Sequence, residues 1–170
     1  MALPDRIALV GFMGSGKSTV GRLLATAVGY QFVDVDTLIE REAGMSIPEL
    51  FRRAGEEAFR ALETRMLLSL GTRRSVVIAT GGGAPMRDVN HQFLCTRCRC
   101  FYLEISAAEA QRRVGGSGGR PLLAANPEGI AELLEARHAI YAATGHTIPA
   151  EGRSPLQVVA AIRALLRRHP

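Results

Sequence analysis

One stretch near the start of the chain combines glycines, a lysine and a hydroxyl at a spacing that can bind phosphate. It reads Gly11-Phe-Met-Gly-Ser-Gly-Lys17-Ser18, a G-x4-G-K-S pattern. In this pattern backbone N–H groups cradle phosphate oxygens, the lysine reaches the β- and γ-phosphates and the hydroxyl binds Mg²⁺. Lys17 is the only lysine of the chain, and every other cationic side chain is arginine. An ammonium is a compact charge, unlike the wide guanidinium fork, so its presence here favours a phosphate site.

The segments on either side of this motif suit it. The apolar run at 7–10 is typical of a buried strand, and 18–28 has helical spacing with Val20, Leu23, Leu24 and Ala27 on one face. A loop that enters a helix N-terminus places favourable partial charge beside phosphate. The alternative is a glycine-rich turn that matches the pattern by chance. We expect an ATP site with Mg²⁺, formed by Gly14, Ser15, Gly16, Lys17, Ser18 and Thr19.

Two aspartates follow the second apolar run. Asp34 and Asp36 flank Val35 at the end of a strand-like segment, and alternate residues of a strand share a face. We therefore expect both carboxylates at the carboxyl edge of the sheet, where open α/β sheets bind ligands. One can hold Mg²⁺ through water, and the other can accept the proton of a substrate hydroxyl. The alternative is that Asp36 caps a helix while Asp34 is solvated.

A third group of candidates lies further along the chain. Gly81, Gly82 and Gly83 follow a strand-like run and would let a ligand approach the backbone, unless they form only a permissive turn. Arg60 and Arg137 can grip a carboxylate in bidentate fashion, or lie on the surface. Arg120 follows a glycine-rich stretch and can neutralise a transferring phosphate from a closing lid, or be a solvated loop arginine.

Alternating strand-like and helical segments place these motifs in one fold. Strand-like runs lie near 6–10, 31–34, 75–79, 99–104 and 146–149. The alternation predicts a three-layer α/β sandwich with a central five-stranded parallel sheet, a P-loop NTPase fold like that of nucleoside monophosphate kinases. We expect a single domain over residues 1–170. A helical insertion at about 36–70, with a helix cap at Ser46 and a break at Gly55, would wall off a second substrate. A lid would cover about 113–126.

Composition narrows the class of protein. The chain has 170 residues, net charge +5 and 47% hydrophobic residues. It has no leader-like N-terminus and no apolar run near the roughly 20 residues that span a bilayer. We expect a cytoplasmic protein, a monomer, with no membrane or nucleic-acid partner, because the arginines are scattered. Cys95, Cys98 and Cys100, with His91, could form a zinc site, but reduced half-buried thiols are favoured.

In their order and spacing these motifs resemble shikimate kinases over nearly the whole chain. The resemblance rests on the G-x4-G-K-S motif and on the blocks Asp34-Val-Asp36, Ser46-Ile-x-Glu-Leu-Phe51, Gly55-Glu-x-x-Phe59-Arg60-x-x-Glu63, Ala79-Thr-Gly-Gly-Gly83, Tyr102-Leu103, Arg120-Pro121-Leu122 and Arg137-x-x-x-Tyr141. It implies transfer of the ATP γ-phosphoryl group to the 3-hydroxyl of shikimate, on the route to aromatic amino acids.

The resemblance also implies roles for individual residues. Lys17 would contact phosphate, Ser18 would bind Mg²⁺, Asp34 would support the metal through water and Asp36 would orient the attacking hydroxyl. The carboxylate and ring of shikimate would be held by Arg60, Gly82 and Arg137, between the neighbouring glycines Gly81 and Gly83. Phe51 and Phe59 would form the pocket wall. Arg120 would be the lid arginine, and Arg112 and Arg153 would lie along the adenine.

Two rival functions stay open at this point. Another small-molecule kinase, such as a gluconate kinase or a nucleoside monophosphate kinase, would share the phosphate loop, although the aspartate pair, Phe59-Arg60 and the triple glycine disfavour it. A non-catalytic nucleotide switch such as a small GTPase normally needs an Asn-Lys-x-Asp motif. Because Lys17 is the only lysine, that motif is absent in its standard form.

Overall fold

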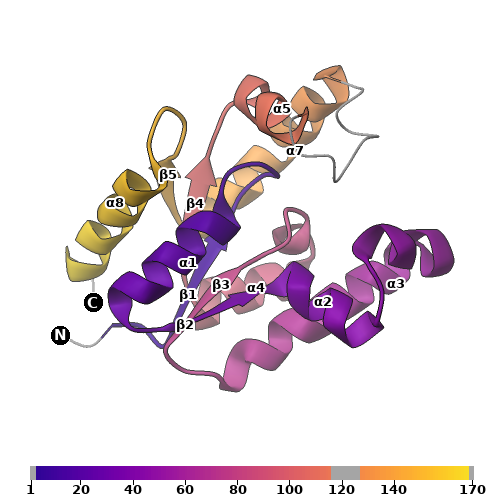
Figure 1. Ribbon diagram of the computed structural model, residues 1–170, viewed down its shortest axis with the longest axis horizontal. Helices are drawn as coiled ribbons and strands as arrows, with labels where there is room; N and C mark the ends of the chain where they lie inside the picture. The colour runs from indigo at the N-terminus through magenta and orange to yellow at the C-terminus, as the bar shows by residue number, and fades with distance from the viewer. Residues whose placement is uncertain (1–2, 116–126, 169–170) are drawn as a thin grey trace.

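The computed structural model describes residues 3–115 and 127–168, and a parallel sheet lies at its centre (Figure 1). Strands β1 (Arg6–Val10), β2 (Gln31–Asp34), β3 (Val76–Ala79), β4 (Arg99–Glu104) and β5 (His146–Pro149) lie in the order β2-β3-β1-β4-β5. Each strand pairs with its neighbours in parallel. The predicted five-stranded parallel sheet is confirmed, with strand boundaries within one residue of those expected.

Helices cover both faces of this sheet (Figure 1). Helix α1 (Lys17–Val28) packs against α8 (Pro155–Arg168), whereas α4 (Asp88–Arg97) contacts α7 (Pro127–Thr144) and α3 (Ile47–Ser69). Helix α5 (Ala107–Gly115) lies against α7, and the 3₁₀ turns η1 (Leu70–Thr72) and η2 (Ala84–Met86) flank β3. The three-layer α/β sandwich predicted from the sequence is therefore confirmed.

The central strands carry the core because both of their faces are covered. Ile7, Leu9 and Val10 of β1 have no exposed surface, and β3 is buried along its whole length. Full burial of such a side chain contributes roughly 1.5–3 kcal/mol each. The runs in β1 and β3 are apolar throughout because these strands lie inside the sheet. This buried centre holds in place the loops at the carboxyl edge of the sheet.

One detail of α1 differs from the expected helix face. Ala27 is exposed, and Gly21 and Ala25 take its place beside Val20 and Leu24 on the buried side. A Cβ atom at Gly21 would come within 2.5 Å of the Phe32 ring. The helix therefore approaches β2 more closely than its apolar spacing alone indicates, because a residue without a side chain lies at the contact.

The segment expected as a helical insertion consists of two helices that pack against each other, α2 (Val35–Ala43) and α3. The Ser46 hydroxyl accepts a hydrogen bond from the Glu49 N–H at 3.4 Å, as the predicted cap requires. Gly55 interrupts α3 with φ 81° and ψ 174°, so the predicted break is confirmed. Among the described residues, no helix combines the length and the apolar character needed to cross a membrane.

Candidate active site

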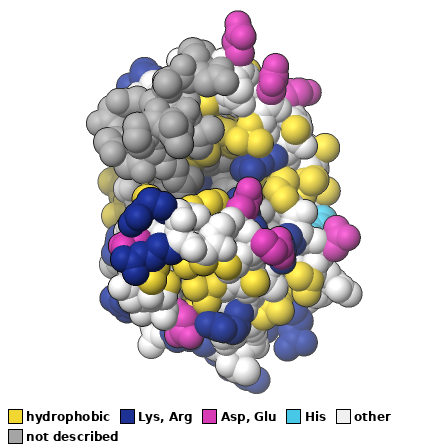
Figure 2. Space-filling model, turned by 90° about the vertical axis from the view of Figure 1, so that its right-hand side faces the viewer, with side chains coloured by type: hydrophobic (Ala, Val, Ile, Leu, Met, Phe, Trp, Pro, Cys, Tyr) yellow, Lys and Arg dark blue, Asp and Glu magenta, His cyan; other side chains and the backbone are white. Residues whose placement is uncertain are grey.

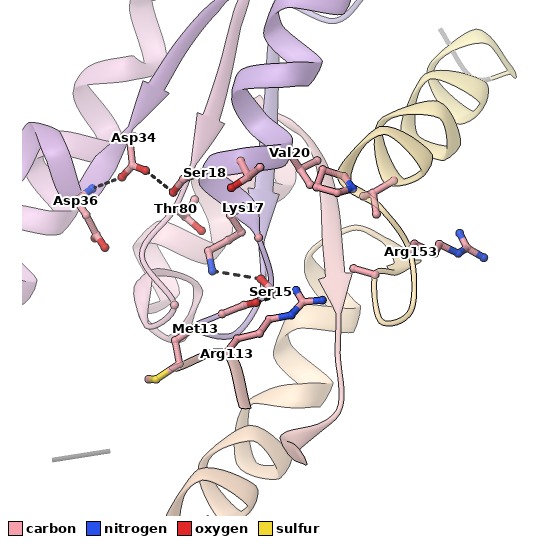
Figure 3. A pocket seen from close by; sticks show the side chains of 17 residues that line it. Met13, Ser15, Lys17, Ser18, Val20, Asp34, Asp36, Thr80, Arg113 and Arg153 are labelled. Atoms are coloured by element: carbon pink, nitrogen blue, oxygen red, sulfur yellow. Dashed lines mark hydrogen bonds between the residues drawn. The ribbon is translucent and has the colours of Figure 1, made fainter. Parts of the chain in front are cut away.

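The loop between β1 and α1 forms the floor of a cavity of about 760 Å³. All six residues expected to bind ATP, from Gly14 to Thr19, line it. Gly14 and Gly16 adopt positive φ values of 75° and 92°, which side chains disfavour, so glycine is required for the curl of this loop. Lys17 Nζ donates to the Gly11 and Phe12 carbonyls, each at 2.8 Å, and to the Ser15 hydroxyl at 3.5 Å, so it lies across the loop; Figure 3 draws the bond to Ser15.

Asp34 joins the start of α1 to the start of α2. One of its carboxylate oxygens accepts a hydrogen bond from the Ser18 hydroxyl at 2.6 Å, and the other accepts from the Asp36 N–H at 3.0 Å (Figure 3). Mg²⁺ is commonly held by one or two hard oxygen ligands together with substrate phosphates. The Ser18 hydroxyl and the Asp34 carboxylate form such a pair beside the phosphate loop, so these residues fit a magnesium site.

The local geometry of the aspartate pair differs from the one expected. The strand ends at Asp34, and Asp36 lies in the first turn of α2, so strand alternation does not align the two carboxylates. The residue that caps α2 is Asp34. The alternative that Asp36 caps this helix is therefore also wrong. Both residues nevertheless line the large cavity. The expected proximity holds because a helix cap turns the chain at the edge of the sheet.

Two of the three glycines after β3 make room for charged side chains. A Cβ at Gly81 would lie 3.1 Å from Asp36 Oδ1 and would collide with Glu63 Oε1. At Gly83 it would lie within 2.5–2.8 Å of the Arg60 guanidinium, whereas at Gly82 it would make only ordinary contacts of 3.6–3.8 Å. None of the three glycines has a positive φ. Gly81 and Gly83 are therefore needed for close approach of these side chains, which a merely permissive turn does not explain.

Arg60 and Arg137 meet in a second cavity of about 410 Å³, which Gly83, Met86, Glu56, Glu57 and Arg87 also line. Because Gly82 lines the larger cavity and Gly83 the smaller one, the two adjoin at the triple glycine. Figure 2 shows this side of the molecule hollowed, with basic and acidic side chains close together. Two guanidinium groups at one cavity can bind a carboxylate.

Neighbouring side chains hold both arginines in place. Arg60 forms an ion pair of 2.8 Å with the fully buried Glu63 and lies 4.9 Å from the centre of the Phe59 ring. Tyr141 Oη donates to the Gly82 carbonyl at 2.5 Å. Burial raises the pKa of Tyr141, and the charge of Arg137 and its hydrogen bond to the phenol oppose that rise. Glu63 follows Arg60 by three residues and Tyr141 follows Arg137 by four, which is about one helical turn in each case. Both residues are part of the motifs quoted above, but the sequence alone assigned them no role.

Phe51 and Phe59 form a packed pair behind Arg60. Their ring centres lie 4.6 Å apart, and Phe59 is buried while Phe51 is half-buried. Neither ring is among the residues that line the two cavities. Their contact with shikimate stays a prediction. In the structure the Phe59 ring packs against the Arg60 guanidinium and supports that side chain.

The arginine that faces the large cavity is Arg113 rather than Arg112. Arg113 lines the cavity and donates from Nη1 to the Gly14 carbonyl at 3.0 Å. Arg112 is 72% exposed and pairs with Glu109. Hydrogen bonds from Arg112, and then from Arg113, lower the pKa of Glu109 to about 2. Sequence reasoning missed Arg113 because two adjacent arginines look alike until the helix phase decides which one faces the ligand.

Two further arginines, Arg153 and Arg120, were expected at the ATP site. Arg153 lines the large cavity beside Pro155 and Val158, with its guanidinium pointing away from the phosphate loop (Figure 3). Arg120 and most of the expected lid at 113–126 lie outside the described residues. The roles of Arg112, Arg153 and Arg120 stay predictions.

The cysteines belong to the packing around α4. Cys95 Sγ lies 3.4 Å from His91 Nε2 on the same helix, and the buried Cys100 thiol donates to the Leu94 carbonyl at 3.3 Å. Burial raises the pKa of Cys98 to about 12. Among residues 3–115 and 127–168, no three histidine, cysteine or acidic side chains gather as metal ligands.

The fold and the two adjoining cavities define a P-loop kinase of small molecules. The family model described as shikimate kinase matches residues 13–167, and the chain belongs to the shikimate kinase family. Shikimate kinase of Geobacter sulfurreducens is 44% identical over 99% of this chain and 96% of its own length. Shikimate kinase of Moorella thermoacetica is 40% identical over 97% of this chain and 96% of its own length.

Solved structures agree with this assignment. Shikimate kinase from Acinetobacter baumannii in complex with shikimate superposes with a TM-score of 0.92 at 38% identity, covering 97% of this chain and 94% of that one. The enzyme from Aquifex aeolicus gives 0.87 at 37% identity, with 95% and 96% covered. A gluconokinase from Sinorhizobium meliloti gives 0.66 at 19% identity, with 99% and 94% covered, a likeness of fold alone.

Proposed function

We propose that this protein transfers the γ-phosphoryl group of ATP to the 3-hydroxyl of shikimate, giving shikimate 3-phosphate and ADP on the route to chorismate and aromatic amino acids. One observation carries the proposal: a phosphate-binding cavity adjoins a cavity with two arginines, and Asp36 lies beside Gly81 near the junction. The first cavity suits a nucleotide. The second suits a small acid whose hydroxyl must be aimed at the terminal phosphate.

The residues of the first cavity neutralise and position the phosphates. Phosphoryl transfer requires little covalent work from a protein, so positioning and charge dominate catalysis. The loop N–H groups and Lys17 would hold the β- and γ-phosphates, while Ser18 and Asp34 would hold Mg²⁺. When bound, the metal withdraws charge from the phosphate oxygens. Arg113 would contact the nucleotide, because it lines the same cavity as the phosphate loop and donates to the Gly14 carbonyl at 3.0 Å.

The residues of the second cavity place the acceptor. Arg60 and Arg137 would bind the shikimate carboxylate, and Asp36 would accept a hydrogen bond from the 3-hydroxyl. As the bond from that oxygen to the γ-phosphorus forms and the bond to the β-bridging oxygen breaks, the hydroxyl proton passes to Asp36. Arg120 would approach the transferring group from the lid. A small polyhydroxy acid needs both the carboxylate and the guanidinium partners that this site combines.

A comparison of acceptors tests the proposal. ADP release is measured at equal concentrations of shikimate, gluconate and AMP, with ATP and Mg²⁺ saturating. We expect turnover with shikimate to exceed the other two by orders of magnitude. A preference for gluconate or AMP would refute the choice of substrate, and tight GTP binding without transfer to any alcohol would favour the switch alternative.

The proposal extends to the oligomeric state and the cellular setting. We expect a single-domain monomer over residues 1–170, acting in the cytoplasm on a small molecule and not on nucleic acid. The scattered arginines and a described site that one chain forms alone support this expectation. Sedimentation velocity at micromolar concentration measures the oligomeric state directly.

A further inference from the structure

Glu63 is a buried carboxylate that the mechanism above does not use. It has no exposed surface and comes from α3, one turn after Arg60. Its Oε2 accepts the 2.8 Å hydrogen bond from Arg60 Nη1. Its Oε1 is also buried and has no hydrogen-bond partner in the described part of the chain. Leaving a buried polar atom unsatisfied costs about 1–3 kcal/mol, so this oxygen needs an explanation.

Charged groups surround Glu63 from three helices. Arg60 and Glu56 lie on its own helix, Asp36 comes from α2, and Arg137 and Tyr141 come from α7. Glu63 Oε1 and Asp36 Oδ1 both lie against Gly81. Burial raises the pKa of Glu63, and the negative charge of Asp36 adds to that rise, whereas Arg60 and Arg137 oppose it. Glu63 therefore lies close to a second carboxylate and to two guanidinium groups, while it has no exposed surface itself.

A substrate carboxylate changes this balance. When it binds to Arg60 and Arg137, it adds a further negative charge to those of Glu63, Asp36 and Glu56, and of these three side chains Glu63 is the fully buried one. An unpaired buried charge is costly, and a group in that position neutralises by taking a proton. Asp36 has to stay ionised to accept the hydroxyl proton, so Glu63 is the group that can be neutralised without loss of function.

We propose that Glu63 takes up a proton when the substrate carboxylate binds, and that it is a positioning residue for Arg60. This inference rests on the proposed function, because it needs an acid bound at the two arginines. The proton would reside on Oε1, which has no partner, while Oε2 continues to accept from Arg60. A neutral carboxyl group costs less to bury than a carboxylate, and Arg60 keeps the orientation that binding requires.

Calorimetry of shikimate binding tests the proposal on the full chain. Titrations between pH 6 and 8 are repeated in PIPES and in imidazole, whose ionisation enthalpies differ, so the difference in heat counts protons taken up. For the wild type we expect proton uptake, and a Kd that rises with pH by up to about tenfold per unit. The carboxylate of shikimate itself is ionised throughout this range.

Two variants distinguish Glu63 from its surroundings. Glu63→Gln keeps the shape and the contact with Arg60 but cannot titrate, so the uptake should vanish and the Kd should no longer change with pH. Glu56→Gln removes the other carboxylate bound to Arg60, which is 68% exposed, and the uptake should persist. Thermal unfolding of each variant establishes that it is folded.

Three results would overturn the inference. The first is binding of shikimate to the wild type with no proton uptake, which decides the matter even when the variant fails to fold. The second is uptake that persists in Glu63→Gln, and the third is uptake that is lost in Glu56→Gln. If shikimate is bound and phosphorylated but no proton is taken up, only this inference fails. If shikimate is not bound at all, the proposed function fails with it.

Discussion

Replacing Arg113 with alanine, beside the same change at Arg112, tests which of two adjacent arginines serves the nucleotide. Arg113 is 29% exposed, lines the large cavity and donates to the Gly14 carbonyl at 3.0 Å. A guanidinium against an aromatic base contributes about 0.5–2 kcal/mol. Its loss therefore corresponds to roughly a 2- to 30-fold rise in the KM for ATP. Arg112 points outward on the same helix, so the Arg112→Ala protein should change by less than about twofold.

The assay measures ADP release, first with ATP varied at saturating shikimate and then with shikimate varied at saturating ATP. The KM for shikimate should be unchanged in both variants, because neither arginine lines the smaller cavity. The pair is well matched: both side chains bind Glu109, so a general loss of helix stability would affect the two alike. If Arg112→Ala raises the KM for ATP as much as Arg113→Ala, the assignment made from the helix phase is wrong.

Three further variants probe the rest of the site. Lys17→Ala should lower kcat by orders of magnitude with the melting temperature nearly unchanged, and activity near the wild-type value would exclude its phosphate role. Asp36→Asn should lower kcat far more than it weakens ATP binding measured by fluorescence titration, and equal losses would indicate a nucleotide-side or structural role. Tyr141→Phe leaves the part-buried Gly82 carbonyl without its donor, so it should cost about 0.5–1.5 kcal/mol of unfolding free energy and raise the KM for shikimate. An unchanged KM there would show that Tyr141 does not position the glycines.

The elements of the fold were predictable because their signals are local. The five apolar runs, the Ser46 cap and the break at Gly55 each depend on a few neighbouring residues, and the structure confirms all three. The site was predictable in outline for the same reason, since a phosphate loop is one continuous segment. The prediction of a shared strand face for Asp34 and Asp36 was wrong, because the strand ends at Asp34 and the helix already begins at Val35.

The details of the site could not be read from local pattern. Arg112 and Arg113 are identical in type, and only the packing of α5 near the phosphate loop turns one of them toward the ligand. Glu63 reads as an ordinary helical glutamate, and it is buried only because α3 and the glycine turn meet there. The need for Gly81 and Gly83 likewise comes from side chains more than 15 positions away in the chain.

By itself, the sequence determined the inventory of chemistry: one ammonium in a glycine loop, an acid pair, and arginines spaced for an anionic substrate. It also determined the order of strands and helices along the chain, because hydrophobic periodicity is a property of neighbours. The tertiary structure decided which of these groups meet, which arginine faces the nucleotide and which carboxylate loses contact with water. Those outcomes depend on contacts between distant segments, and burial and charge act only once such contacts have formed.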